Sequence, residues 1–505
     1  MNDVANAAYS APGMKPLVLA LLGAALSVLA FPPFGPGILV LPGIALFLAA
    51  VRTAENRRQG VLFGSLYGLA FFGGLMWWLA ELELLALILV PVQAAFLAMY
   101  GWWLSGHNDR APETWSLLSV GGWAVMELIR YHFPVGGLEW GAAGYALSDN
   151  VVTRLPAAVF GTSGLTILVV ILAAEIGLAF QVRSARLIAA PIVTAAVALG
   201  LYMLLSPVFP SEDPDQPVSI VQGSTPCPFE HCPPDERFRT YEQHLELTRS
   251  LEPDSAGLVI WPEGSTGATN ADPVNNEEIG EAIAEEARRL GSRFVVGGDR
   301  VVSDTDWINA NVYFNAEGEI VGEYRKQHPV PFGEYIPWRP LFEWIPALDQ
   351  VPRDMIRGEG PVLMDEVGSV ISFEGGFARF AFAVRKAGAK VIIVNTNEAS
   401  YGATAPTADQ FIGMTRMRAV ELGVPVIHAA VTGKSTVIDI DGSVGPTTRL
   451  GESTVLQDTY RRGSIDTLYS TSGDVVIWAV ALAGLVNVAR LRWLVGSQTQ
   501  QLKEE

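Results

Sequence analysis

Eight apolar runs constrain the fold of this chain more than any other feature. Seven of them lie in the first 205 residues and one near the C-terminus, at 16–31, 38–51, 60–79, 84–104, 115–129, 164–180, 187–205 and 475–494. A helix needs about 20 apolar residues to cross a bilayer. The first run is followed by Pro32-Pro33 rather than by a small-residue cleavage site, which favours an uncleaved span over a signal peptide. We therefore expect a multi-pass α-helical membrane bundle of about eight spans.

Basic residues in the short loops predict how these spans are oriented. They occupy every second loop and both ends of the chain, at Lys15, Arg52, Arg57, Arg58, Arg110, Arg183, Arg186, Arg490, Arg492 and Lys503. Loops rich in lysine and arginine stay on the cytoplasmic side of a membrane. Seven spans from a cytoplasmic start then place the region between the seventh and eighth spans outside the cytoplasm.

Charge separates this region from the rest of the chain. Only 17% of the 505 residues are charged and the net charge is -18, yet the acidic residues concentrate between 211 and 474. The sequence thus predicts four parts: a membrane domain at 1–207, a water-soluble domain at 211–472, a last span at 475–494 and a cytoplasmic tail at 495–505. An acidic domain of this kind makes nucleic acid an unsuitable partner.

The two cysteines lie close together in the acidic domain. Cys227 and Cys232 are placed to form a local disulfide in an oxidising compartment, or to remain two free thiols. His231 lies between them, but this trio lacks the second ligand cluster that structural zinc sites have, so we expect no metal.

The periodicity changes after residue 217 from long apolar runs to short ones. Strands are predicted at 218–223, 258–262, 294–297, 310–314, 320–324, 370–373, 391–394 and 424–429, and helices at 236–251, 277–290, 376–387 and 407–422. Alternation of strands and helices over some 250 residues indicates a layered α/β domain.

Three of the predicted strands end in residues of complementary chemistry. These are Glu263, Lys326 and Ser372. A carboxylate can accept the proton of a nucleophile, and an ammonium group beside it can stabilise an oxyanion. Taken singly, each residue has a simpler interpretation, since serine is also a preferred helix cap and the two charged residues suit a helix start and a solvated strand end. Together in one domain they are harder to dismiss, and they suit nucleophilic catalysis with Ser372 as the candidate nucleophile.

The motifs around these residues are specific. They are Trp-Pro-Glu263, Lys326-Gln-His-Pro-Val-Pro-Phe-Gly-Glu334, Ile371-Ser-Phe-Glu374 and Asn395-Thr-Asn397, together with Phe31-Pro-Pro-Phe-Gly35 and Arg416-Met-Arg-Ala-Val-Glu421. In this order they resemble the nitrilase, or carbon-nitrogen hydrolase, superfamily. With membrane spans on both sides, the chain is similar to the apolipoprotein N-acyltransferase family, and this resemblance covers nearly its whole length.

The resemblance implies an extracytoplasmic α-β-β-α nitrilase-like sandwich on a bacterial inner-membrane protein, with no metal or organic cofactor.

 It also implies a phospholipid acyl donor, a diacylated apolipoprotein as acceptor, a monomer and a ping-pong reaction through an acyl-enzyme. By motif, Glu263 is then the general base, Lys326 the oxyanion partner and Ser372 the nucleophile. Glu334 and Glu374 are supporting acids, and Phe373 flanks the site.

Ser372 departs from the family, which has a cysteine at this position. An alcohol is harder to deprotonate than a thiol of pKa about 8.5, and its ester is a poorer acyl donor. Two hypotheses follow: an acyltransferase slowed by serine, or a catalytically silent homologue that binds lipid or lipoprotein or scaffolds another membrane enzyme. A third hypothesis, a membrane-tethered amidase, does not explain why seven spans precede the domain.

Overall fold

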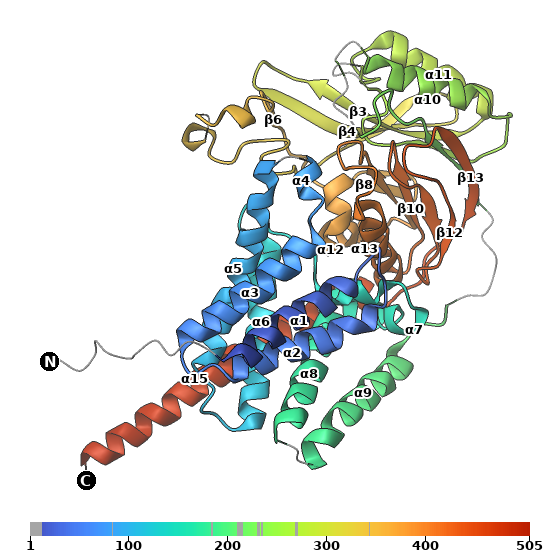
Figure 1. Cartoon of the computed structure of the whole chain (residues 1–505). Coiled ribbons are helices and arrows are strands. Elements are labelled where there is room, and N and C mark those ends of the chain that lie inside the picture. Colours follow the sequence, from blue (N-terminus) through green and yellow to red (C-terminus); the bar gives the residue numbers. More distant parts are fainter. Residues whose placement is uncertain are drawn as a thin grey trace.

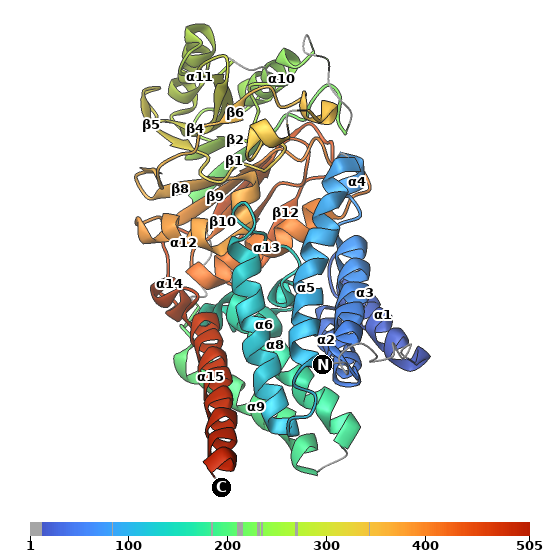
Figure 2. The ribbon, with the colours of Figure 1, turned by 90° about the vertical axis from the view of Figure 1, so that its left-hand side faces the viewer.

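The molecule has a helical part and an α/β part, which stack end to end (Figures 1 and 2). This computed structural model describes residues 13–504 except 83, 183–184, 210–215, 230–232, 234–235, 268–270 and 343. The chain builds most of the helical part first, then the α/β part, and returns along the helical part in its last helix, α15.

Each of the eight apolar runs forms a long helix. These are α1 (Met14–Leu29), α2 (Val40–Arg52), α3 (Arg57–Leu75), α5 (Leu89–Ser105), α6 (Pro112–His132), α8 (Ala157–Val182), α9 (Ala185–Leu205) and α15 (Val475–Glu504), with short helices α4 (Leu79–Leu82) and α7 (Val151–Arg154) between them. Among the described residues, three stretches are long and apolar enough to cross a membrane: 86–105, 157–179 and 475–493. The helical part is therefore that of a membrane protein with several candidate spans, and the number eight stays a prediction.

Glycines let the helices approach each other closely. A Cβ atom on Gly60 would lie 2.3 Å from the backbone oxygen of Gly101, and one on Gly121 would lie 2.6 Å from Cα of Gly484. The second contact joins α6 to α15, the helix that follows the α/β part in sequence. Small residues at helix crossings are the usual means of close packing inside a membrane, where burial of apolar surface gives no net attraction between helices.

Two β-sheets form the centre of the α/β part. The first has the order β13-β1-β2-β3-β4-β5, with β6 paired to β4, and the second has the order β12-β11-β10-β9-β8-β7. The strands are β1 (Gln216–Gln222), β2 (Leu258–Trp261), β3 (Arg293–Val301), β4 (Asp306–Phe314), β5 (Ile320–Arg325), β6 (Asp354–Met355), β7 (Leu363–Met364), β8 (Val367–Ile371), β9 (Val391–Thr396), β10 (Val426–Ala430), β11 (Thr436–Ile438), β12 (Val444–Thr447) and β13 (Thr454–Tyr460).

Apolar side chains from both sheets meet in one buried cluster, which includes Ile260, Val295, Ile371 and Ile393. On the outer side of the first sheet lie α10 (Phe238–Arg249) and α11 (Glu277–Leu290). On the outer side of the second sheet lie α12 (Ala378–Lys386) and α13 (Thr407–Leu422), which also rest on the helical part (Figures 1 and 2). The second sheet thus connects to the membrane helices through α12 and α13.

The structure corrects two of the strand predictions. The predicted strand at 370–373 begins earlier and ends at Ile371, because Ser372 adopts a positive φ of 48° that breaks the extended backbone. Strands β6, β7 and β11 to β13 were not predicted. All of β12 is exposed, so it lacks the alternation of apolar and polar residues by which a half-buried strand is recognised.

The structure also bears on the cysteines. Cys227 is disulfide-bonded, which favours the bridged alternative. The only other cysteine of the chain, Cys232, and the neighbouring His231 lie outside the described residues.

The Gly121–Gly484 contact gives a test of how α15 is held. Gly484→Leu should lower the free energy of unfolding by about 1–3 kcal/mol, because the new side chain meets the α6 backbone. The control is Gly200→Leu in α9, where an added Cβ meets nothing within 4 Å. Thermal unfolding of the detergent-purified variants measures both. Equal stability of the two variants would contradict the close crossing.

Candidate active site

A buried ammonium group lies between two carboxylates at one edge of the first sheet. Lys326, which is 1% exposed, follows β5 and places its Nζ 2.6 Å from Glu334 Oε1 and 3.3 Å from Glu263 Oε1. Glu263 follows β2 and also accepts a hydrogen bond of 2.7 Å from the Asn309 side chain. The other oxygen of Glu334 accepts the backbone N–H of Val330 at 2.6 Å. Three of the predicted site residues are therefore in direct contact.

The pleat of the sheet directs these side chains toward the second sheet. Tyr324 faces the cluster between the sheets, so Lys326, two residues later, continues on the same side. On β4, Tyr313 faces that cluster and Asn309 lies four residues before it. Apolar residues fill the middle of this face, and the polar ones stand at its edge.

The charges of this cluster are closely coupled. Burial alone lowers the pKa of Lys326, but the carboxylates of Glu263 and Glu334 outweigh it and hold that pKa above its usual range. Burial raises the pKa of Glu334, against the attraction of Lys326. We conclude that Lys326 stays charged, with carboxyl groups in excess around it.

Asp299 is a further carboxyl group of this cluster that sequence reasoning missed. It lies on β3 directly opposite Asn309. Because side chains alternate between the two faces of a strand, Asp299 shares a face with Gly297 and Val295, and Val295 packs in the cluster between the sheets. Its Oδ1 atom is buried without a hydrogen-bond partner. Burial, together with the charges of Glu263 and Glu334, raises the pKa of Asp299 to about 7. No motif in the sequence indicates the strand register that brings Asp299 beside Asn309.

Ser372 stands at the corner where β8 ends. It begins a 3₁₀ helix, η6 (Ser372–Gly376), which Phe377 separates from α12. Its positive φ of 48° is uncommon for a residue other than glycine and costs about 1–3 kcal/mol, so the surrounding contacts must hold Ser372 in this conformation. Strained corners of this kind, between a strand and a helix, expose a nucleophile to a substrate.

Glu374 holds this corner against the segment that carries Lys326. Its carboxylate is fully buried and accepts four hydrogen bonds, from the backbone N–H groups of Ile371 (2.9 Å), Gln327 (2.5 Å) and His328 (2.9 Å) and from the Tyr324 hydroxyl (2.7 Å). Burial raises the pKa of Glu374, and these donors oppose that shift. One side chain thus fixes Ser372 relative to Lys326.

An aromatic stack supports the same junction. The ring of Phe373 is parallel to that of His328, with 5.3 Å between centroids, and the Phe377 ring meets both edge-on. Burial lowers the pKa of His328 to about 3, so the imidazole is neutral near pH 7. Phe373 therefore lies beside Ser372 as part of a packed apolar wall.

All six predicted site residues thus belong to one region. Glu263, Lys326 and Glu334 form the ionic cluster, while Ser372, Phe373 and Glu374 form the corner that Glu374 ties to it. Among the described residues, no group of three or more histidine, cysteine, aspartate or glutamate side chains is arranged to hold a metal ion.

Comparison with known proteins matches both parts of the chain. Residues 23–174 match the model of the apolipoprotein N-acyltransferase N-terminal domain, and residues 218–468 match the carbon-nitrogen hydrolase model. A solved amidase from Nesterenkonia sp. has 14% sequence identity and a TM-score of 0.39, over 52% of this chain and 97% of the amidase.

Curated relatives extend over nearly the full length. Proteins named apolipoprotein N-acyltransferase are 28% identical in Geobacter metallireducens and 29% identical in Rhodopseudomonas palustris, each over 96% of both chains. Another, from Caulobacter vibrioides, is 29% identical over 94% of both chains. Since one family model matches the helical part, the other matches the α/β part, and these relatives span both, the chain belongs to the apolipoprotein N-acyltransferase family.

Proposed function

We propose that this protein acylates the N-terminal amine of diacylated apolipoproteins, with a phospholipid as acyl donor and Ser372 as nucleophile. The observation that carries the proposal is the junction at which Glu374 ties the Ser372 corner to the segment of Lys326, whose ammonium group contacts Glu263 and Glu334. The relatives that span the whole chain carry the same activity in their names.

The first half-reaction forms an acyl-enzyme. Glu263 accepts the proton of the Ser372 hydroxyl while its oxygen attacks the ester carbonyl carbon of the phospholipid. Lys326 stabilises the oxyanion. The bond between the carbonyl carbon and the glycerol oxygen then breaks, and Glu263 returns the proton to that oxygen. The products are a lysophospholipid and an acyl ester on Ser372.

The second half-reaction transfers the acyl group. The free amine of the diacylglyceryl-cysteine attacks the ester carbonyl carbon, and Glu263 accepts a proton from the nitrogen. The bond to the Ser372 oxygen breaks, and this oxygen takes the proton back. The result is an amide on the lipoprotein and a free serine.

The membrane helices suit two lipid-anchored substrates. Donor and acceptor both reach the site by diffusion within the bilayer, and apolar surroundings protect the acyl intermediate from water. The proposal therefore includes the finer expectations from sequence: a monomer with about eight spans in the bacterial inner membrane, domain boundaries near 207, 472 and 494, and a four-layer sandwich on the extracytoplasmic side.

Acylation of Ser372 is the direct test. The purified protein, incubated with a phospholipid that carries a labelled acyl chain, should gain the label at Ser372, as detected by peptide mass spectrometry. Ser372→Ala should gain none. Ser372→Cys should react at least about tenfold faster, because a thiol ionises more readily than an alcohol.

The chemistry of the adduct provides the control. The Ser372 ester should resist neutral hydroxylamine, and the thioester of Ser372→Cys should be cleaved by it. Transfer of the label to a diacylated lipopeptide tests the second half-reaction. A folded Ser372→Cys variant that binds lipopeptide without forming an acyl-enzyme would refute the proposal in favour of a silent homologue.

Removal of the ammonium group tests the role of Lys326. Lys326→Met should lower the acylation rate about 10²–10³-fold, as loss of one oxyanion donor does elsewhere. The single variant also leaves two carboxylates unpaired and so loses stability. The double variant Lys326→Met/Glu334→Gln removes one of these charges and should recover part of the stability without recovering the rate. Recovery of both the stability and the acylation rate in the double variant would exclude Lys326 from the chemistry.

The raised pKa of Asp299 predicts a pH-dependent stability. The group takes up protons in the folded state up to about pH 7, whereas its ordinary pKa is 3.8, so it lowers stability as pH rises from about 4 to 7. Asp299→Asn lacks this effect. Its melting temperature, relative to the parent protein, should therefore be higher at pH 8 than at pH 4. Asp304→Asn, an exposed change in the same hairpin, is the control. A melting-temperature difference between Asp299→Asn and the parent protein that does not vary with pH would contradict the raised pKa of Asp299.

A further inference from the structure

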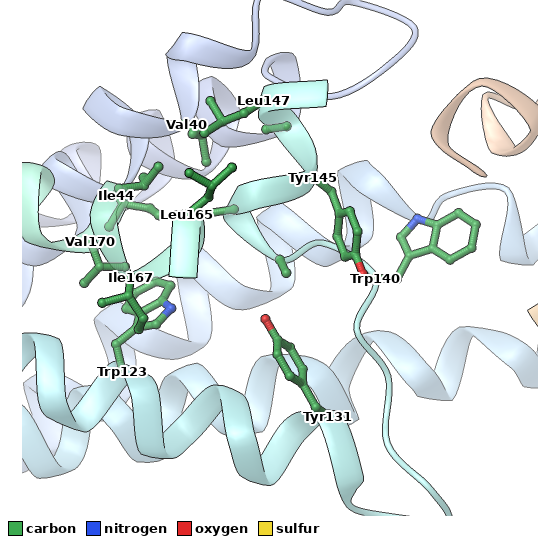
Figure 3. Close-up of a cluster of buried hydrophobic side chains, with 14 of the residues drawn as sticks. Val40, Ile44, Trp123, Tyr131, Trp140, Tyr145, Leu147, Leu165, Ile167 and Val170 are labelled. Carbon is green, nitrogen blue, oxygen red and sulfur yellow. The ribbon is translucent and has the colours of Figure 1, made fainter. Parts of the chain in front are cut away.

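The segment between α6 and α8 leaves the helical part and reaches the α/β part. Tyr131 lies in the last turn of α6, just before this segment, and Trp140 and Tyr145 lie along it, close to the apolar core of the helices (Figure 3). Its side chains contact α13, where the Trp140 indole N–H donates to Gln410 Oε1 at 2.8 Å. They also contact the residues that follow Ser372.

Glu139 in this segment caps the helix that begins after the Ser372 corner. Both of its carboxylate oxygens accept the backbone N–H of Ala378, the first residue of α12, at 3.3 and 3.2 Å. Glu139 is 7% exposed. A carboxylate at the N-terminus of a helix satisfies a free N–H group and interacts favourably with the helix dipole.

Tyr145 extends this contact to the corner itself. Its hydroxyl lies 2.9 Å from Glu139 Oε2 and 3.3 Å from the backbone oxygen of Gly376, the last residue of η6. Arg418 on α13 donates to the same hydroxyl at 2.8 Å. The hydroxyl therefore joins the helical part, α13 and the corner at a single buried point.

Arg379 makes the reciprocal connection. From the first turn of α12 it donates to the backbone oxygens of Tyr131 in α6 (2.9 Å) and of Gly136 in the segment after α6 (2.8 Å), and it lies 3.9 Å from Glu139. The start of α12 is thus held both by side chains of the segment after α6 and by its own Arg379.

These contacts and those of Glu374 hold the two ends of the same short segment. Glu374 binds Ile371, just before Ser372, while Glu139 and Tyr145 bind Ala378 and Gly376, just after it. We propose that Glu139 and Tyr145 are positioning residues of the membrane part that set the placement of Ser372. This inference rests on the proposed function, in which Ser372 is the nucleophile.

The test compares acylation rates in variants that are all folded. Glu139→Ala and Tyr145→Phe should each lower the rate of acyl-enzyme formation about 10–100-fold, because small displacements of a reacting group cost factors of this size. The KM for the phospholipid should stay within about threefold, since neither side chain is proposed to contact the substrate. Glu139→Gln keeps an oxygen that accepts the Ala378 N–H and should retain most of the rate.

Trp140→Phe is the matched control. It removes one buried hydrogen bond from the same segment, but the bond leads to α13 and not to the corner. It should lower the melting temperature to a similar extent and leave the rate within about twofold. A Glu139→Ala variant that acylates at the parental rate, or a Trp140→Phe variant that is equally slow, would overturn the inference.

Hydrogen exchange separates this inference from the proposed function. Backbone amides at 372–378 should exchange at least about tenfold faster in Glu139→Ala than in the parent, and those of β9 should not change. Unchanged exchange at 372–378 would overturn the positioning role. A parent and a Ser372→Cys variant that both fail to acylate would instead refute the proposed function, and the exchange result would still decide whether Glu139 orders the corner.

Discussion

The carboxylate of Glu374 is the interaction on which the rest of the site depends. It is fully buried, so every lone pair that lacked a donor would cost free energy. Its four donors come from two separate places in the chain, the segment 324–328 and the residue before Ser372. Satisfying the carboxylate therefore requires these two places to lie side by side. The need to pair one buried charge is what brings Lys326 and the Ser372 corner together.

The period of the β-strand explains why the chemistry lies at the edge of the sandwich. Side chains on one face of a strand recur every second residue, so a single face can be apolar in the middle and polar at its end. The first sheet does this on β4, where Tyr313 packs in the apolar cluster and Asn309 bonds Glu263. The apolar contacts hold the two sheets together, and this rigid pairing fixes the polar residues at their edge.

Local patterns in the sequence were enough to predict most strands and helices. The ends of predicted strands singled out Glu263, Lys326 and Ser372, whereas Glu334, Phe373 and Glu374 came from the family resemblance, and the catalytic roles of all six stay predictions. Helices α11 and α13 begin and end where their periodicity does. Contacts that depend on strand register or on the approach of distant segments could not be predicted. Asp299 joins the site only because β3 pairs with β4, and Glu139 meets Ala378 across 239 positions of sequence. Neither residue has a local signal that distinguishes it from an ordinary polar residue.

Under the proposed function, serine in place of cysteine slows both half-reactions. Its hydroxyl is harder to deprotonate than a thiol, which slows formation of the acyl-enzyme, and its ester is less reactive toward an amine, which slows transfer. A slower second step lengthens the life of the intermediate, so exclusion of water matters more here than with cysteine. Phe373, which follows Ser372 in the chain, meets the ring of Phe377 edge-on and supplies apolar surface on this side of the corner. If serine slows transfer more than acylation, the acyl-ester form accumulates, and its detection then distinguishes a slow catalyst from a silent homologue.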